Sequence, residues 1–93
     1  MANYPKLDWT ETEGGEKSST EEYELATRFR LGGPNKGTWS AIMNGASLTS
    51  GTGEYGYDFA SLEIAKVALE QAMKNDIDLR ILKANETLRR YES

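Results

Sequence analysis

The sequence predicts an α+β fold in which a small antiparallel sheet packs against one long helix. Residues 21–31 and 38–43 alternate apolar and polar side chains, a pattern typical of strands with one buried face. Residues 59–75 repeat apolar side chains every three or four positions, which is typical of an amphipathic helix. A three-strand meander, the helix and a returning strand would then bury the apolar faces of both layers.

Length and composition limit the class of protein. The chain has 93 residues, so it holds at most one domain, and 38% of its residues are hydrophobic. It contains no Cys and no His, which excludes disulfides, thiol chemistry, zinc fingers and imidazole general bases. No apolar stretch approaches the roughly 20 residues of a membrane span. We expect no metal site, no cofactor and no catalytic residues.

The first 20 residues are expected to form an acidic polar tail or loop, with residues 21–93 as a single domain. Gly14, Gly15 and a Lys-Ser-Ser-Thr run favour loop structure, although Leu7 and Trp9 offer anchors for a short strand. Residues 1–24 carry seven acidic and two basic side chains, whereas residues 25–93 carry eight acidic and nine basic ones. The net charge of −4 therefore comes from the N-terminal quarter, which indicates a solvated terminus or an interaction tail.

The first predicted strand covers residues 21–31. Its odd positions form one face: Tyr23, Leu25, Thr27, Phe29 and Leu31. A helix is the alternative, because Ser19 followed by Glu22 matches a capping box and Gly32 suits a helix end. The period of two favours the strand.

A hairpin is predicted next. Residues 32–37 have turn composition, and Trp39, Ala41 and Met43 share one face of a strand over residues 38–43. Asn44-Gly45 follows at once and suits a type I′ turn, so a third strand would begin at residues 46–49. Residues 50–56 then form a glycine-rich connection.

The predicted helix over residues 59–75 has Asp58 or Ser61 as its N-cap. None of the nine glycines lies in it, since all fall between residues 14 and 56. Asn75-Asp76 is expected to end it. Ile77, Leu79 and Ile81 then alternate with polar residues, which predicts a returning strand through about Lys83. Residues 85–93 suit either a short helix or an edge strand.

Gly51-Thr52-Gly53-Glu54-Tyr55-Gly56 matches the spacing of a dinucleotide-binding glycine loop. Such a loop follows the first strand of a βαβ unit in a larger domain, and that context is missing here. A glycine-rich connection between strands is the better interpretation.

Residues 55–69 resemble the second half of an RNA-recognition motif, in which an aromatic-Gly-aromatic strand precedes a helix with similar alanine spacing. Under this resemblance, residues 20–22 would begin the first helix of the family and residues 81–85 would form its last strand. The resemblance implies that Tyr55 and Tyr57 stack on bases. The alternation itself favours packing of both tyrosines and Phe59 beneath the helix.

Two groups of residues are candidates for binding a partner. Glu22, Glu24, Arg28 and Arg30 continue one strand face, where cross-strand charge pairing in solvent is expected rather than an anion site. Large aromatic side chains on an uncovered sheet face are the usual hot spots of interfaces, which adds Trp39, Tyr55 and Tyr57.

The sequence therefore predicts a small, acidic, cytoplasmic and non-enzymatic protein. It would dock on a larger protein or complex as a regulator or inhibitor, a class that includes phage-encoded accessory proteins. A nucleic-acid-binding module that uses Tyr55 and Tyr57 is the first alternative, although the negative charge opposes it. A homo-oligomeric structural subunit, with a homodimer as its simplest form, is the second.

Overall fold

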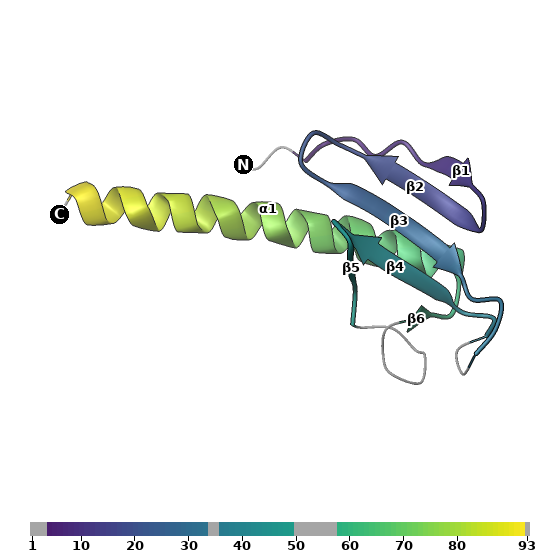
Figure 1. The fold of residues 1–93 in the computed structure, drawn as a ribbon. Helices are drawn as coiled ribbons and strands as arrows, with labels where there is room; N and C mark the ends of the chain where they lie inside the picture. The colour runs from purple at the N-terminus through teal and green to yellow at the C-terminus, as the bar shows by residue number, and fades with distance from the viewer. Residues whose placement is uncertain (1–3, 34–35, 50–57, 93) are drawn as a thin grey trace.

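The computed structural model describes residues 4–33, 36–49 and 58–92, with the backbone alone for the last two of these. It confirms the α+β class, because these residues form an antiparallel sheet and one long helix (Figure 1). The elements in chain order are β1 Thr10–Thr12, β2 Gly15–Ser19, β3 Glu24–Phe29, β4 Trp39–Met43, β5 Ala46–Ser47, β6 Asp58–Phe59 and α1 Leu62–Glu92.

The sheet is a meander in the order β1-β2-β3-β4-β5, and β6 also pairs with β4. Strand β4 therefore has two partners along one edge: Ile42 pairs with Ser47 of β5, and Ser40 pairs with Asp58 of β6. The predicted hairpin is confirmed, since Asn44 and Gly45 have φ angles of 51° and 84° between β4 and β5. A type I′ turn needs positive φ at both positions, which this Asn-Gly pair supplies.

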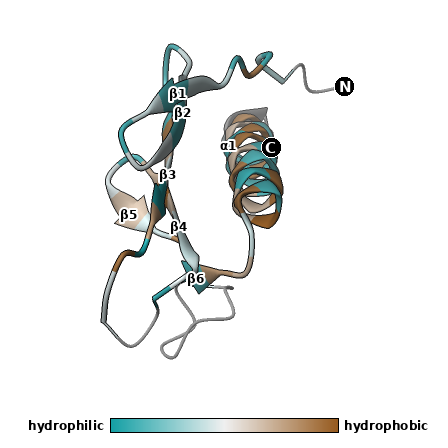
Figure 2. Ribbon diagram, turned by 90° about the vertical axis from the view of Figure 1, so that its right-hand side faces the viewer, coloured by the Kyte–Doolittle hydropathy of each residue, from teal (hydrophilic) through white to brown (hydrophobic). Residues whose placement is uncertain are grey.

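The helix crosses one face of the sheet, and the core lies between them (Figure 2). The predicted alternation in β3 is confirmed: Leu25 and Thr27 are buried on the helix side, whereas Glu24 and Arg28 are exposed. The buried apolar side chains are Tyr23, Leu25, Ala41, Phe59, Ala65, Leu69 and Met73. The core is therefore thin: it consists of one layer of side chains from the sheet and one layer from the first half of α1.

Residues 10–19 differ from the expected tail or loop, because they form the hairpin of β1 and β2. Thr27 fastens it to β3: its Oγ1 accepts a hydrogen bond from the Glu16 N–H at 2.9 Å and donates one to the Glu16 carbonyl at 3.1 Å. Gly15 lies so close to β3 that a Cβ there would sit 2.1 Å from the Thr27 carbonyl oxygen. The hairpin is held by backbone contacts and by Thr27. Its sequence therefore does not need the alternation of apolar residues by which strands are recognised.

The returning strand predicted at residues 77–83 is wrong, since α1 continues without a break to Glu92. Residues 85–93 accordingly form neither a separate short helix nor an edge strand over the described positions. Neither Gly nor Pro follows Gly56, so nothing terminates the helix. Asp76 and Arg80 form an i,i+4 ion pair at 3.2 Å across the expected boundary, which further favours helix there.

The start of α1 confirms one of the two expected N-caps. The Ser61 Oγ accepts a hydrogen bond from the Ile64 N–H at 3.2 Å, whereas Asp58 lies in β6. The order of elements also overturns the resemblance to an RNA-recognition motif. Residues 20–22 begin no helix, and residues 81–85 are helical instead of forming a last strand.

Candidate interaction surface

The second half of α1 extends past the sheet into solvent (Figure 1). We call residues 78–90 the helix overhang, because every side chain in this range is exposed. Four of its large apolar side chains are between 43% and 63% exposed: Leu79, Ile81, Leu82 and Leu88. At 1.5 Å per residue, the 31-residue helix is about 46 Å long, and only its first half covers the core.

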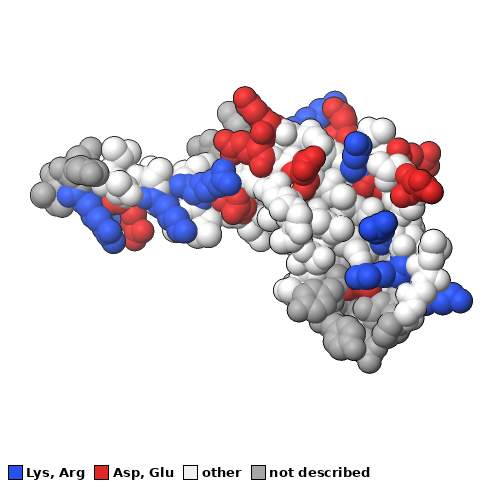
Figure 3. All heavy atoms as spheres, viewed as in Figure 1, with Lys and Arg blue, Asp and Glu red and all other residues white. Residues whose placement is uncertain are grey.

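The overhang combines apolar and basic side chains. Leu79 and Leu82 lie three residues apart on one side, and Ile81 and Leu88 lie two turns apart on another. Arg80, Lys83, Arg89 and Arg90 outnumber its acidic residues, Asp78 and Glu86. Basic side chains follow the protruding end, whereas many acidic ones gather over the body (Figure 3).

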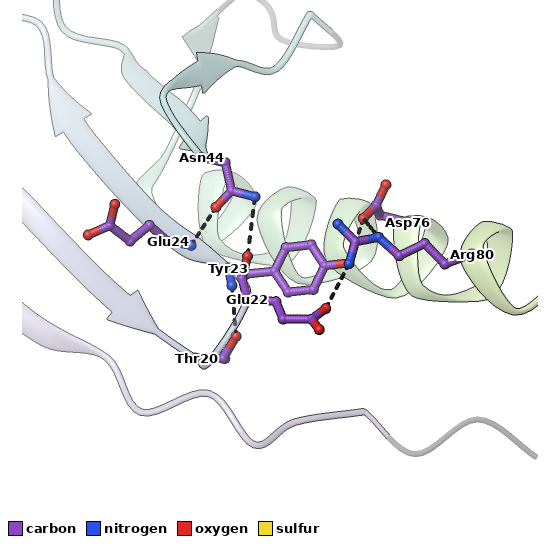
Figure 4. Close-up of polar contacts among 7 residues, drawn as sticks. All are labelled: Thr20, Glu22, Tyr23, Glu24, Asn44, Asp76 and Arg80. Carbon is purple, nitrogen blue, oxygen red and sulfur yellow. Dashed lines mark hydrogen bonds and ion pairs between the residues drawn. The ribbon is translucent and has the colours of Figure 1, made fainter.

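A polar cluster holds the base of the overhang against the sheet (Figure 4). The Tyr23 hydroxyl donates a hydrogen bond to Asp76 Oδ2 at 2.5 Å, and Arg80 Nε lies 3.2 Å from the same oxygen. Arg80 Nη1 also contacts Glu22 Oε2 at 2.7 Å, and its guanidinium lies 5.4 Å from the centre of the Tyr23 ring. Four side chains therefore fix the direction in which the helix leaves the body.

The corner that precedes β3 is itself held in place by side chains (Figure 4). The Thr20 Oγ1 accepts a hydrogen bond from the Tyr23 N–H at 3.1 Å. The Asn44 side chain accepts one from the Glu24 N–H at 2.7 Å and donates one to the Glu22 carbonyl at 3.4 Å. Asn44 thus serves both its own turn and the segment that carries Glu22 and Tyr23.

Both tyrosines that contact the helix carboxylates keep their protons at neutral pH. Burial, followed by the hydrogen bond to Asp76, raises the pKa of Tyr23 above its usual value of 10.0. The hydrogen bond from the Tyr4 hydroxyl to Asp78 Oδ1, 2.7 Å long, is the main cause that raises the pKa of Tyr4. Each hydroxyl therefore remains a hydrogen-bond donor to α1.

The four charged residues predicted to pair along one strand face do not pair with one another. Glu22 finds its partner on the helix, and Arg30 finds its partner in β6. Glu24 and Arg28 are exposed and have no ion pair among the residues that the structure describes. Among these four residues, the structure therefore shows no ion pair on a solvated strand face, because the partner of Arg30 is the buried Asp58.

Asp58, the partner of Arg30, is a buried carboxylate that the sequence suggested only as a helix cap. Its side chain is fully buried and accepts hydrogen bonds from Arg30 Nε at 3.0 Å, Ser40 Oγ at 3.0 Å and Thr38 Oγ1 at 3.1 Å. Burial alone would raise the pKa of Asp58, but the bonds from Arg30, Ser40 and Thr38 outweigh it and lower that pKa below 3.8. This cluster is structural, because it joins the residue after β3 and the start of β4 to β6.

Trp39 lies on the helix side of the sheet and not on the uncovered face. It pairs with Phe29 across β3 and β4, their ring centroids lie 5.0 Å apart, and it packs against the core. Tyr55 and Tyr57 lie outside the described residues. The uncovered face has a hollow of about 240 Å³ lined partly by Ala26 and Ile42. Among the described residues, this hollow has no aromatic side chain in its lining.

No group of His, Cys, Asp and Glu within the described ranges is arranged to hold a metal ion. Likewise, α1 lacks the apolar stretch that a membrane-crossing helix needs over the part of the chain described. Comparisons with protein families, with curated proteins and with solved structures give no match for this chain.

Proposed function

We propose that this chain is a non-enzymatic interaction protein that docks on a larger protein through the helix overhang, and so regulates or inhibits it. The observation that carries the proposal is the exposure of Leu79, Ile81, Leu82 and Leu88 on a helix that continues beyond its own sheet. Helices gain most of their stability in proteins from packing an apolar face. An overhang whose four large apolar side chains are left uncovered by the described residues suits a partner that supplies a covering layer.

The chemistry of the overhang indicates the kind of partner. Its apolar side chains are flanked by Arg80, Lys83 and Arg89, so the complementary surface is an apolar groove with acidic margins. The polar cluster at its base presents the helix in one direction, which reduces the entropy lost on binding. Docking of a helix in a groove is a recognised mode of regulation and inhibition.

A second copy of the chain is the second candidate partner. Ile81, Ala84 and Leu88 follow the three- and four-residue spacing of a coiled-coil seam, and all three are exposed. This arrangement supports the homo-oligomeric alternative. The nucleic-acid alternative depends on Tyr55 and Tyr57, and no described contact favours it.

The test compares two pairs of substitutions on the same helix. Leu79→Ser with Leu82→Ser alters the overhang, whereas Ile64→Ser with Val67→Ser alters an exposed apolar pair of equal spacing on the body. Each tagged protein would be purified from host lysate with and without nuclease treatment, at low and high salt. We expect a stoichiometric protein that the wild type and the control pair retain and that the overhang pair loses.

Equal retention by both pairs would contradict the overhang as the docking element. Nucleic acid that co-purifies only without nuclease would overturn the proposal in favour of the first alternative. Sedimentation of the purified protein over a range of concentrations distinguishes the second alternative, because self-association through the overhang depends on concentration and disappears in the overhang pair.

A further inference from the structure

An aromatic hollow of about 400 Å³ opens where the β1–β2 hairpin meets the start of α1. Phe29, Trp39 and Leu62 form its apolar wall, and Glu11, Gly14 and Glu16 lie on the hairpin side. The two rings are tilted by 56° at a centroid distance of 5.0 Å. We call this the aromatic hollow; it lies far from the overhang, at the opposite end of α1.

Two glycines line the hollow where the hairpin turns into β2. Gly14 has a φ of 86°, a conformation that other residues rarely adopt, and a Cβ there would meet nothing within 4 Å. The backbone of Gly15, the next residue, lies against the Thr27 carbonyl of β3 and leaves no room for a Cβ. At these two positions the hairpin therefore adds no side chain to the lining of the hollow.

The charge beside the rings is unbalanced. Glu11 of β1 stands directly opposite Glu16 of β2, so the two side chains share the face that lines the hollow. Like charges in this position repel each other. Lys66 neutralises Glu16 at 3.3 Å, but Glu11 is exposed and has no ion-pair partner in the described part of the chain.

Neighbouring charges leave the hollow favourable for a cation. The first turn of α1 carries Glu63, which offsets the positive end of the helix dipole near Leu62. Lys66 is engaged on its other side as well, since its Nζ lies 5.3 Å from the centre of the Trp9 ring. The ammonium of Lys66 is thereby held by Glu16 and Trp9, and no described residue supplies a counter-charge to the carboxylate of Glu11.

We propose that the aromatic hollow receives an arginine or lysine side chain of a protein partner, with its alkyl stem on the rings and its cationic head at Glu11. Cations bind over aromatic rings, and Trp is the strongest such acceptor. A guanidinium also stacks on a ring while it donates hydrogen bonds to a carboxylate. This inference extends the proposed function, on which it rests, by adding a second contact and the chemistry that this contact selects.

Titration followed by NMR tests the inference without an identified partner. The ¹⁵N-labelled full chain would be titrated with Nα-acetyl-arginine N-methylamide, and separately with its neutral analogue made from citrulline. The lysine derivative forms a third arm. We expect saturable shifts of the Trp39 indole N–H and of the Glu11 and Gly14 amides with the two cationic probes, and none with the citrulline probe.

A matched pair of variants separates the site from the general negative charge. Glu11→Gln and Glu13→Gln change the net charge equally, but only Glu11 lines the hollow. We expect Glu11→Gln to weaken binding at least fivefold and Glu13→Gln to leave it within twofold, with both folds verified by their amide spectra. Saturation with citrulline, equal loss in both variants, or no shift at Trp39 would each overturn the inference.

Failure of this site and failure of the proposed function are distinguishable. The probes address the aromatic hollow alone, whereas the Leu79 and Leu82 substitutions address the overhang alone. A retained partner with no probe binding would reject the hollow and keep the docking proposal. Probe binding with no overhang-dependent partner would reject the proposed docking element, and the hollow would then need a partner of its own.

Discussion

Asp58 shows how one carboxylate can be both buried and charged. Its side chain is removed from solvent, yet Arg30, Ser40 and Thr38 together supply the hydrogen bonds that water would give. Arg30 remains 45% exposed and keeps part of its own hydration. The cluster joins strands that meet only through β4, so its loss would loosen the edge at β6.

Asp58→Asn is therefore expected to destabilise the fold by about 1.5–3 kcal/mol, the range for hydrogen bonds to charged groups. The pKa of Asp58 is lowered in the folded state, so its charge stabilises the fold above the unfolded pKa of about 3.9. That contribution is lost as pH falls from there towards the folded pKa. Urea unfolding from pH 7 to pH 2 would measure it, and an equal acid-dependent loss in D58N would contradict the assignment.

Glu11 and Glu16 face each other across β1 and β2, and the repulsion between their carboxylates lowers the stability of the fold. Glu11→Gln removes the repulsion, so it is expected to raise the free energy of unfolding by a few tenths of a kcal/mol. Glu13→Gln, in the adjoining turn, is the matched control. Chemical denaturation at low and high salt would measure both, and the gain at position 11 should shrink as salt screens the repulsion. A destabilised E11Q would mean that Glu11 has a structural role.

At the scale of elements, the N-terminus of α1 depends on Ser61. Ser61→Ala removes the acceptor for the Ile64 N–H and is expected to cost about 1 kcal/mol. Ser19→Ala, at an exposed position of β2, is the control and should change stability by less than half as much. Thermal unfolding followed by circular dichroism measures both variants. Equal effects would show that the cap contributes nothing specific.

The elements also show how far the sequence predicts this fold. The alternation in β3 and β4, the Asn44-Gly45 turn and the Ser61 cap were predictable, because each depends on residues close together in the chain. The β1–β2 hairpin depends on Thr27 and a glycine contact, which leave no periodic pattern. Ile77, Leu79 and Ile81 alternate as in a strand, whereas the absence of a terminator after Asp76 and the i,i+4 spacing of Asp76 and Arg80 indicate that the helix continues.

The interaction surface was less predictable than the fold for the same reason. The ion pairs of Glu22 with Arg80 and of Arg30 with Asp58 join residues 58 and 28 positions apart. No pattern within a strand identifies such partners. The side of the sheet on which Trp39 lies depends on which face the helix covers, and the strand pattern is equally compatible with either. Leu79, Ile81 and Leu82 of the overhang fall within the predicted returning strand, and Leu88 falls in the segment that suits either a helix or an edge strand.

At the scale of the whole molecule, one helix serves two environments. Leu69 is fully buried beneath the sheet, whereas Leu82 is 63% exposed on the overhang. Leu69→Ala is expected to cost about 3–5 kcal/mol, which is a large share of the roughly 5–14 kcal/mol available to a chain of this size. Leu82→Ala should change the free energy of unfolding by less than about 0.5 kcal/mol. Urea titrations of both variants give the comparison.

The stability of Leu82→Ala, taken together with its retention of a partner, shows what the exposed side chain does. If Leu82→Ala leaves stability unchanged and yet weakens partner retention, then its side chain serves binding and not folding. A clear loss of stability in L82A would show instead that the overhang is covered in the isolated protein. Sedimentation would then establish whether a second copy supplies that cover.

The two-part character of α1 has a consequence for amide hydrogen exchange. Amides near Leu69 and Met73 open only when the sheet and helix separate, so their exchange should report global unfolding. Amides beyond Arg80 are held by intrahelical bonds alone and should exchange through fraying, with protection that declines towards the C-terminal end. A single helix would thus span nearly the full range of protection in the molecule. A partner that binds the overhang would therefore be detected by slower exchange of the amides beyond Arg80, which exchange rapidly in the free protein.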